Sequence, residues 1–152
     1  MRVMVFMKAN KESEAGVMPS TELLTAMGKF NEELVKSGVL LAGEGLHPSS
    51  KAKRITFAGG KTTVTDGPFS ETKELVAGFW LWQVKSMDEA VEWISRMSAY
   101  VGPVVSPGSE GQVEIRPVFE PADFGAALTP ELKDAEARLR AQSAARKQPK
   151  PT

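Results

Sequence analysis

The alternation of apolar and polar residues predicts six strands along the chain. Residues 76–85 are the most strand-like segment because aromatic and aliphatic side chains follow one another there, and residues 2–7 are apolar on both alternating faces. Two short runs flank Gly59-Gly60, a pair typical of a two-residue hairpin turn. Pro117 has no amide hydrogen, so the last strand is expected at a sheet edge or a bulge. The expected strands are residues 2–7, 39–42, 54–58, 61–65, 76–85 and 113–119.

Three further segments repeat their apolar residues every three or four positions, as amphipathic helices do. The first is expected to begin after Ser20, a good N-cap residue that follows a polar loop, and to stop at Gly38. The second follows Ser86-Met87-Asp88-Glu89, which has the pattern of a capping box. The third opens at Thr129-Pro130 and has only a thin apolar face.

The order of these elements is β-α-β, a hairpin, β-α-β and an appended helix. This order predicts an α+β, ferredoxin-like architecture, with helices packed on one face of a mainly antiparallel sheet. In the segment 76–85, Phe79 and Leu81 point to one face and Trp80 and Trp82 to the other, and both pairs are apolar. The second face therefore needs a cover, and the simplest cover is another copy of the chain.

The composition narrows the possible functions. Lysine plus arginine total 19, aspartate plus glutamate total 19, and the formal net charge is zero, which argues against a nucleic-acid binder. The chain has no cysteine, which excludes disulfides, thiolate metal sites and cysteine nucleophiles. A single histidine excludes a three-histidine metal site within one subunit. We therefore expect no metal and no cofactor.

The two ends of the sequence differ in character. Near the start, the uninterrupted apolar run between Arg2 and Lys8 is only five residues long, whereas a secretory signal needs about 7–15. The longest apolar run is also far below the roughly 20 residues that span a bilayer. We expect a cytoplasmic protein that makes no membrane contact. Near the other end, residues 121–146 are expected to form a helical extension, and residues 147–152, which have no apolar side chain, a disordered tail.

The most informative string is Thr65-Asp66-Gly67-Pro68-Phe69-Ser70-Glu71-Thr72-Lys73-Glu74. Its Asp-Gly-Pro core favours a turn in any protein. The whole string, however, strongly resembles the signature of the DGPF family, a branch of the YCII-related superfamily. Glu44-Gly45-Leu46 and Gly78-Phe79 are also similar to that branch. The resemblance covers about residues 2–120, so we assign residues 1–120 to a YCII-related domain.

This resemblance implies a ferredoxin-like homodimer of the dimeric α/β-barrel type, cytoplasmic and bacterial. It also implies an acid–base site, because in the wider superfamily an aspartate and a histidine in a cleft are the proposed pair. Asp66 matches the aspartate of the signature. Superfamily members that use the histidine carry it near the first helix, where this chain has residues 19–22, Pro-Ser-Thr-Glu, and its one histidine is His47.

The residues themselves make His47, Glu44 and Phe69 the other candidates beside Asp66. His47 is expected at the end of a strand, where pockets open, and histidine exchanges protons near neutral pH. Glu44 lies between two glycines, which would let a ligand approach closely. Three of these four candidates also have a purely structural interpretation: His47 as an exposed loop residue, Asp66 as a cap of its own turn, and Glu44 as a turn-stabilising or ion-paired residue.

Two functions are consistent with these observations. The first is a small-molecule-binding homodimer with Glu44 and Phe69 as ligand-binding residues. If this homodimer is an enzyme, Asp66 and His47 are its acid–base residues and a small organic acid or phenol is its substrate. The second is a non-catalytic binding or regulatory module, since DGPF proteins often occur beside alternative sigma factors. The sequence leaves open whether the protein catalyses a reaction.

Overall fold

The structure is a computed structural model that describes residues 1–105 and 110–146, and it contains two units. The first unit spans Met1–Val118 and the second begins at Phe119. The tail expected at residues 147–152 lies outside the described residues. None of the helices in the part that is described is long and apolar enough to cross a membrane.

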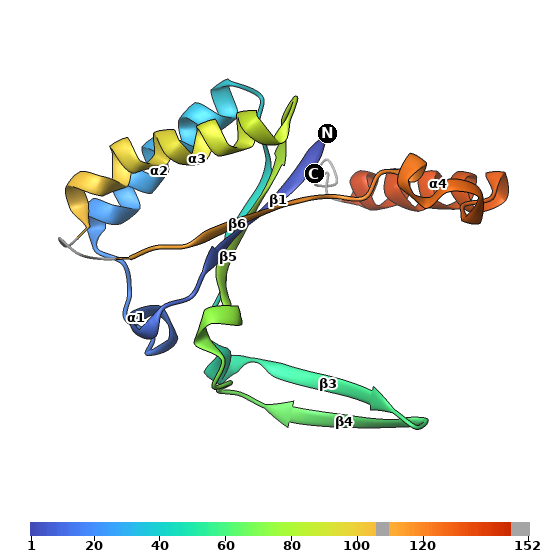
Figure 1. The fold of residues 1–152 in the computed structure, drawn as a ribbon, viewed down its shortest axis with the longest axis horizontal. Helices are drawn as coiled ribbons and strands as arrows, with labels where there is room; N and C mark the ends of the chain where they lie inside the picture. The colour runs from blue at the N-terminus through green and yellow to red at the C-terminus, as the bar shows by residue number, and fades with distance from the viewer. Residues whose placement is uncertain (106–109, 147–152) are drawn as a thin grey trace, which may run out of the picture. The chain divides into compact units, whose positions relative to one another are not determined.

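Four strands of the first unit form an antiparallel sheet in the order β2-β5-β1-β6. This order places the first and third strands of the sheet, β1 and β5, in its centre, as in a ferredoxin-like fold, and it confirms the α+β prediction (Figure 1). Pro117 ends the edge strand β6, where its missing amide hydrogen costs no sheet hydrogen bond. The strands are β1 (Arg2–Lys8), β2 (Leu40–Gly45), β5 (Val76–Gln83) and β6 (Val113–Pro117).

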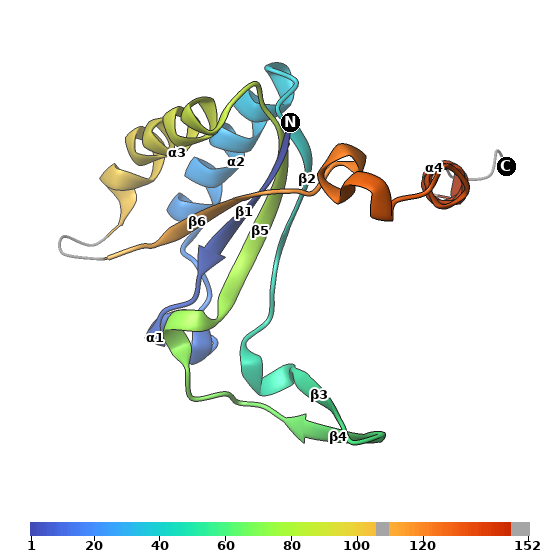
Figure 2. The same ribbon diagram turned by 45° about the vertical axis from the view of Figure 1, so that its right-hand side comes forward.

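The two long helices, α2 (Thr21–Lys36) and α3 (Met87–Val101), lie together on one side of this sheet (Figures 1 and 2). Both begin as predicted, because the hydroxyls of Ser20 and Ser86 accept the amide hydrogens of the first helical turn. Gly38 follows α2 with a φ of 71°, a conformation that favours glycine at a helix end. The core between helices and sheet contains Val3, Val5, Phe30, Leu34, Val39, Trp80, Trp82, Val84, Ala90 and Trp93.

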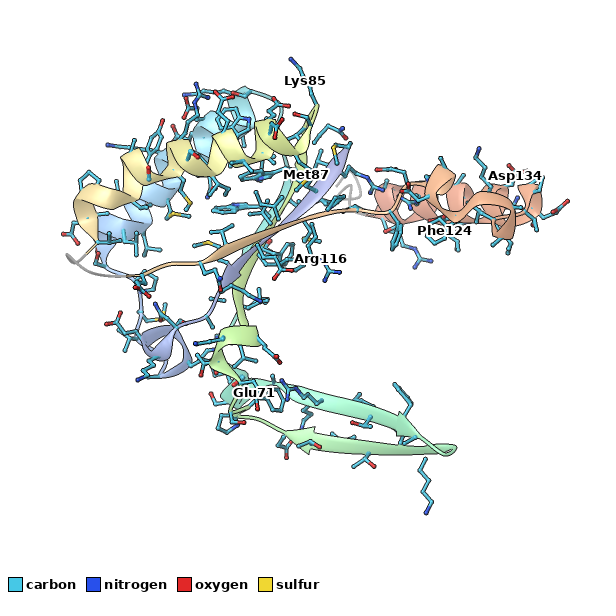
Figure 3. The ribbon with its side chains drawn as sticks, viewed as in Figure 1. Glu71, Lys85, Met87, Arg116, Phe124 and Asp134 are labelled. Atoms are coloured by element: carbon cyan, nitrogen blue, oxygen red, sulfur yellow. The ribbon has the colours of Figure 1, made fainter. Side chains whose placement is uncertain are left out.

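The sheet has two apolar faces, and α2 and α3 lie on only one of them. Trp80 and Trp82 are buried on the helix side. On the opposite face, which we call the open face, Phe6 pairs with Phe79 and Met4 with Leu81 across β1 and β5, and all four are half-buried. Glu114 and Arg116 of β6 lie beside these pairs, and Figure 3 shows Arg116 on the side away from α2 and α3.

A second, two-stranded sheet is formed by the hairpin β3 (Lys53–Ala58) and β4 (Lys61–Asp66). The turn is at Gly59 and Gly60, as predicted, with φ values of 56° and 74°. Every residue of both strands is exposed. Short 3-10 turns precede and follow the hairpin: η1 (Ser49–Lys51) and η2 (Thr72–Glu74).

Some local expectations differ from the structure. The loop expected before Ser20 contains a short helix, α1 (Lys11–Glu14), because Asn10 and Ser13 cap it reciprocally. Strand β2 continues to Gly45, held by its pairing with β5. The last strand ends at Pro117 rather than Phe119, and a 3-10 turn, η3 (Gly102–Val104), follows α3.

The second unit contains a 3-10 segment, η4 (Pro121–Ala127), and the helix α4 (Pro130–Arg146), which begins at the predicted Thr129-Pro130. The rings of Phe119 and Phe124 contact each other with centroids 5.3 Å apart. No described residue of η4 or α4 is buried. The extension expected at residues 121–146 is therefore helical over most of its length.

Candidate functional site

The four residues singled out from the sequence lie on two segments of the first unit. Glu44 belongs to β2, where it pairs with Phe79 of β5, and His47 follows two residues after this strand. Asp66 is the last residue of β4, and Phe69 lies in the turn that follows. Glu44, His47 and Asp66 are exposed, and Phe69 is half-buried.

The turn that carries Asp66 and Phe69 is packed directly against η1, the turn that follows His47. The Phe69 amide donates a hydrogen bond to the Ser49 hydroxyl at 3.0 Å, and the Gly67 amide donates to the Ala52 carbonyl at 3.0 Å. A Cβ at position 67 would lie 1.7 Å from the Ser49 carbonyl oxygen, so only glycine permits this approach. The structure therefore brings the segments of His47 and Asp66 together.

Ser49 is fixed in turn by Glu14, a residue that the sequence did not single out. The Ser49 hydroxyl, in a residue that is 5% exposed, donates to a Glu14 carboxylate oxygen at 2.5 Å. The Ser49 amide also faces this carboxylate, at 3.2 Å from the nearer oxygen. Hydrogen bonds to a carboxylate are stronger than those between neutral groups, so Glu14 of α1 fixes the position of η1. Through Ser49, η1 in turn fixes the turn that carries Asp66 and Phe69. The only sequence signal nearby is the capping pattern Asn10–Ser13, which predicts the helix but not its contact.

The side chains of Asp66 and His47 differ in their contacts. Asp66 forms an ion pair with Lys53, the residue opposite it at the open end of the hairpin, with 2.5 Å between Lys53 Nζ and Asp66 Oδ1. Both side chains are well exposed, at 73% and 66%, so water screens this pair and it adds little stability. Within residues 1–105 and 110–146, no hydrogen bond or ion pair joins His47 to Asp66.

Phe69 has a second neighbour besides Ser49. The guanidinium carbon of Arg54, the second residue of β3, lies 3.8 Å from the centroid of the Phe69 ring. Glu71, which Figure 3 shows beside the base of the hairpin, accepts a hydrogen bond from the Ser70 hydroxyl at 3.4 Å. The base of the hairpin thus combines a carboxylate, an aromatic face and several cations at the protein surface.

The described residues contain no group of three or more acidic or histidine side chains placed to hold a metal ion. A surface hollow of about 310 Å³ lies along α4 and is lined by Leu139, Gln142, Ser143 and Arg146. It includes none of the four candidate residues. The base of the hairpin and the segment packed on it carry a carboxylate, Asp66, and an imidazole, His47, which are both side-chain types that can transfer protons.

Comparison with known proteins gives two matches. Residues 1–120 match the family model of the YCII-related domain. The chain is also similar to an uncharacterised protein of Rhizobium meliloti (strain 1021), with 37% identity over 117 residues that cover 76% of this chain and 85% of that protein.

Proposed function

The chain belongs to the YCII-related domain family, and from this premise we propose that it is a cytoplasmic homodimer of the DGPF branch that binds a small organic molecule and performs acid–base chemistry on it. Asp66 is the residue that takes or gives the proton, and His47 is its partner. Glu44 and Phe69 contact the ligand. The string from Thr65 to Glu74 supports the assignment to the DGPF branch.

One observation carries the proposed site: the contact between the Asp66–Phe69 turn and η1. Asp66 directly precedes Gly67, and His47 lies two residues before Ser49, and Gly67 and Ser49 touch through their backbones. An acid–base pair needs two proton-exchanging groups held in one place. The hydrogen bonds of Ser49 to Phe69 and Glu14 support such a fixed place.

The homodimer is supported by the open face of the sheet. Within the first unit, α2 and α3 lie on the other face, yet the open face carries Phe6, Phe79, Met4 and Leu81 as cross-strand pairs. An apolar patch of this kind is typical of an interface, and a second copy offers the same patch to it.

Hydrogen exchange at carbon tests the catalytic part of the proposal. The full-length protein is incubated in D₂O with small carbonyl compounds, pyruvate, levulinate and cyclohexanone, and NMR follows the loss of the C–H signals. We expect exchange above the buffer rate for at least one compound, and a loss of about 10²-fold or more in Asp66→Asn and in His47→Gln. Asp88→Asn, which removes an exposed carboxylate from α3, is the matched control and should exchange normally.

The results separate two outcomes. Exchange at the wild-type rate in both Asp66→Asn and His47→Gln would show that neither residue takes part in the proton transfer. If none of the three compounds exchanges faster than in buffer, the proposed catalytic activity is wrong and a non-catalytic binding module is favoured.

A non-catalytic module that binds a partner protein is the second candidate, and α4 is the observation in its favour. This helix lies beyond the matched domain, residues 1–120, and exposes Leu132 and Leu139. If α4 serves a partner, removal of residues 131–152 will abolish that interaction, and circular dichroism will show that the domain stays folded.

A further inference from the structure

The guanidinium of Arg54 lies over the aromatic ring of Phe69 at the base of the hairpin. Its guanidinium carbon lies 3.8 Å from the centroid of Phe69, within the range of a cation–π contact. Because the five N–H donors of a guanidinium lie in its plane, stacking on a ring leaves their edge available to an acceptor. The contact thus orients a cation beside Phe69 without consuming its hydrogen bonds.

The backbone that carries the Phe69 ring is held in place. The Phe69 amide is bound to Ser49, and Ser49 is bound to Glu14. Residues that are held by packing and by second hydrogen bonds lose less freedom when a ligand arrives, which strengthens binding. Arg54 therefore differs from an isolated surface arginine, because the backbone of its aromatic partner is hydrogen-bonded to a buried hydroxyl.

The guanidinium of Arg54 is available to bind an anion, because the neighbouring carboxylates are engaged with other residues. The neighbouring Lys53 already pairs with Asp66. Arg54 itself has no ion pair with any carboxylate of the described residues, and Lys51 and His47 add further positive or protonatable groups to the same segment. Glu14 is engaged with Ser49, and Glu71 accepts from Ser70. The segment from His47 to Arg54 contains no acidic residue at all.

We propose that Arg54, stacked on Phe69, binds the carboxylate of a small organic acid, so that the ligand of the proposed site is an acid rather than a neutral phenol. A guanidinium edge matches the two oxygens of a carboxylate and can bind both at once. The ligand's carboxylate then lies at the edge of Phe69. This inference rests on the proposed function, because it names the ligand class of that same site.

A matched set of probes tests the proposal in the full chain. Benzoate, benzamide and phenol have the same ring, and only benzoate carries a carboxylate. Each is titrated into ¹⁵N-labelled protein while NMR follows the Arg54 Nε–Hε signal, the Phe69 amide and the His47 ring. We expect benzoate to shift all three signals, and benzamide and phenol to bind at least about tenfold more weakly because they lack the charge.

Three variants complete the test. Arg54→Gln should weaken benzoate binding about tenfold or more. Arg54→Lys keeps the charge but not the planar guanidinium, so its affinity for benzoate should lie between those of the wild type and Arg54→Gln. Lys61→Gln removes the same charge from the far end of the hairpin and should bind benzoate like the wild type. The amide spectrum of each variant shows whether its fold is kept.

The outcomes distinguish this inference from the proposed function. Phenol that binds as tightly as benzoate, or benzoate binding at His47 that survives Arg54→Gln, would overturn the role of Arg54 and leave the site itself in place. If none of the three probes shifts His47, Glu44 or Phe69 at concentrations up to the solubility limit, both the anion site and the proposed small-molecule site are wrong.

Discussion

The four-stranded sheet and the β3–β4 hairpin are both antiparallel, yet one is built into a core and the other is exposed on every residue. In β5 the sequence VAGFWLWQ is apolar on both faces, and its tryptophans are buried under α2 and α3. The hairpin is apolar on one face only, where Ile55, Phe57 and Val64 are all exposed, and its other face carries threonines. The same backbone pairing therefore gives stability in one place and accessible surface in the other, and the difference comes from the helices.

The proposed site lies where these two regions meet, at the base of the hairpin. A two-stranded hairpin is marginally stable alone in water, so its base must be held by the rest of the protein. The contacts of Gly67, Phe69 and Ser49 provide that support. The rigid part then positions the residues, and the exposed part leaves them open to a ligand.

The largest expected effect is a difference in the free energy of unfolding between two variants, one without a buried ring of the four-stranded sheet and one without an exposed ring of the hairpin. Trp82 is fully buried and its ring lies 5.6 Å from that of Trp80, whereas Phe57 is 79% exposed. We expect Trp82→Ala to lower the free energy of unfolding by about 3–5 kcal/mol. Phe57→Ala should change it by less than about 0.5 kcal/mol. Urea unfolding followed by circular dichroism measures both, and similar losses in the two variants would contradict the contrast between the regions.

An intermediate effect is expected where the hairpin joins the first unit. Gly67→Ala places a methyl group against the Ser49 carbonyl, where there is no room, and should cost about 1–3 kcal/mol and displace the Phe69 amide signal. Gly45→Ala is the matched control, because a Cβ there meets nothing within 4 Å. Equal stability of the two variants would show that the turn does not press on η1.

The smallest effect concerns the helix-covered side of the sheet. The Tyr100 hydroxyl donates to Glu33 at 2.6 Å, and this hydrogen bond raises the Tyr100 pKa above its ordinary value of 10.0. The stabilisation is therefore complete below pH 10 and is lost as the pH rises through the pKa of the folded state. Tyr100 is the single tyrosine, so absorbance at alkaline pH reports it alone.

Glu33→Gln should move this titration to lower pH, because the carboxylate acceptor and its charge are gone. Glu32→Gln, one residue earlier on α2, should leave it in place. A Tyr100 titration that is the same in Glu33→Gln and in the wild type would show that the hydrogen bond between α2 and α3 is absent in solution.

Much of the fold could be predicted because its signals are local. Ser20 and Ser86 start their helices, Gly59-Gly60 forms the hairpin turn, and Pro117 lies at a sheet edge, each for reasons contained in a few neighbouring residues. The four-residue α1 was missed because its cap, Asn10 with Ser13, lies in a polar segment without apolar periodicity.

The support of the candidate site could not be predicted in the same way. Glu14 and Ser49 are 35 residues apart in sequence, and neither belongs to a pattern that points to the other. Arg54 and Phe69 meet only because the hairpin folds back on itself. Contacts of this kind depend on tertiary structure, so periodicity and motif spacing do not reveal them.

The central claim is that the open face of the sheet is covered by a second copy, and sedimentation equilibrium tests it most directly. We expect the wild type to have twice the mass of the 16.4 kDa protomer. Leu81→Asp, which places a charge on the open face, should sediment as a folded protomer. Val91→Asp, an exposed position on α3, should remain a dimer. A wild-type mass of 16.4 kDa at every concentration, or a Leu81→Asp variant that stays dimeric, would contradict the claim.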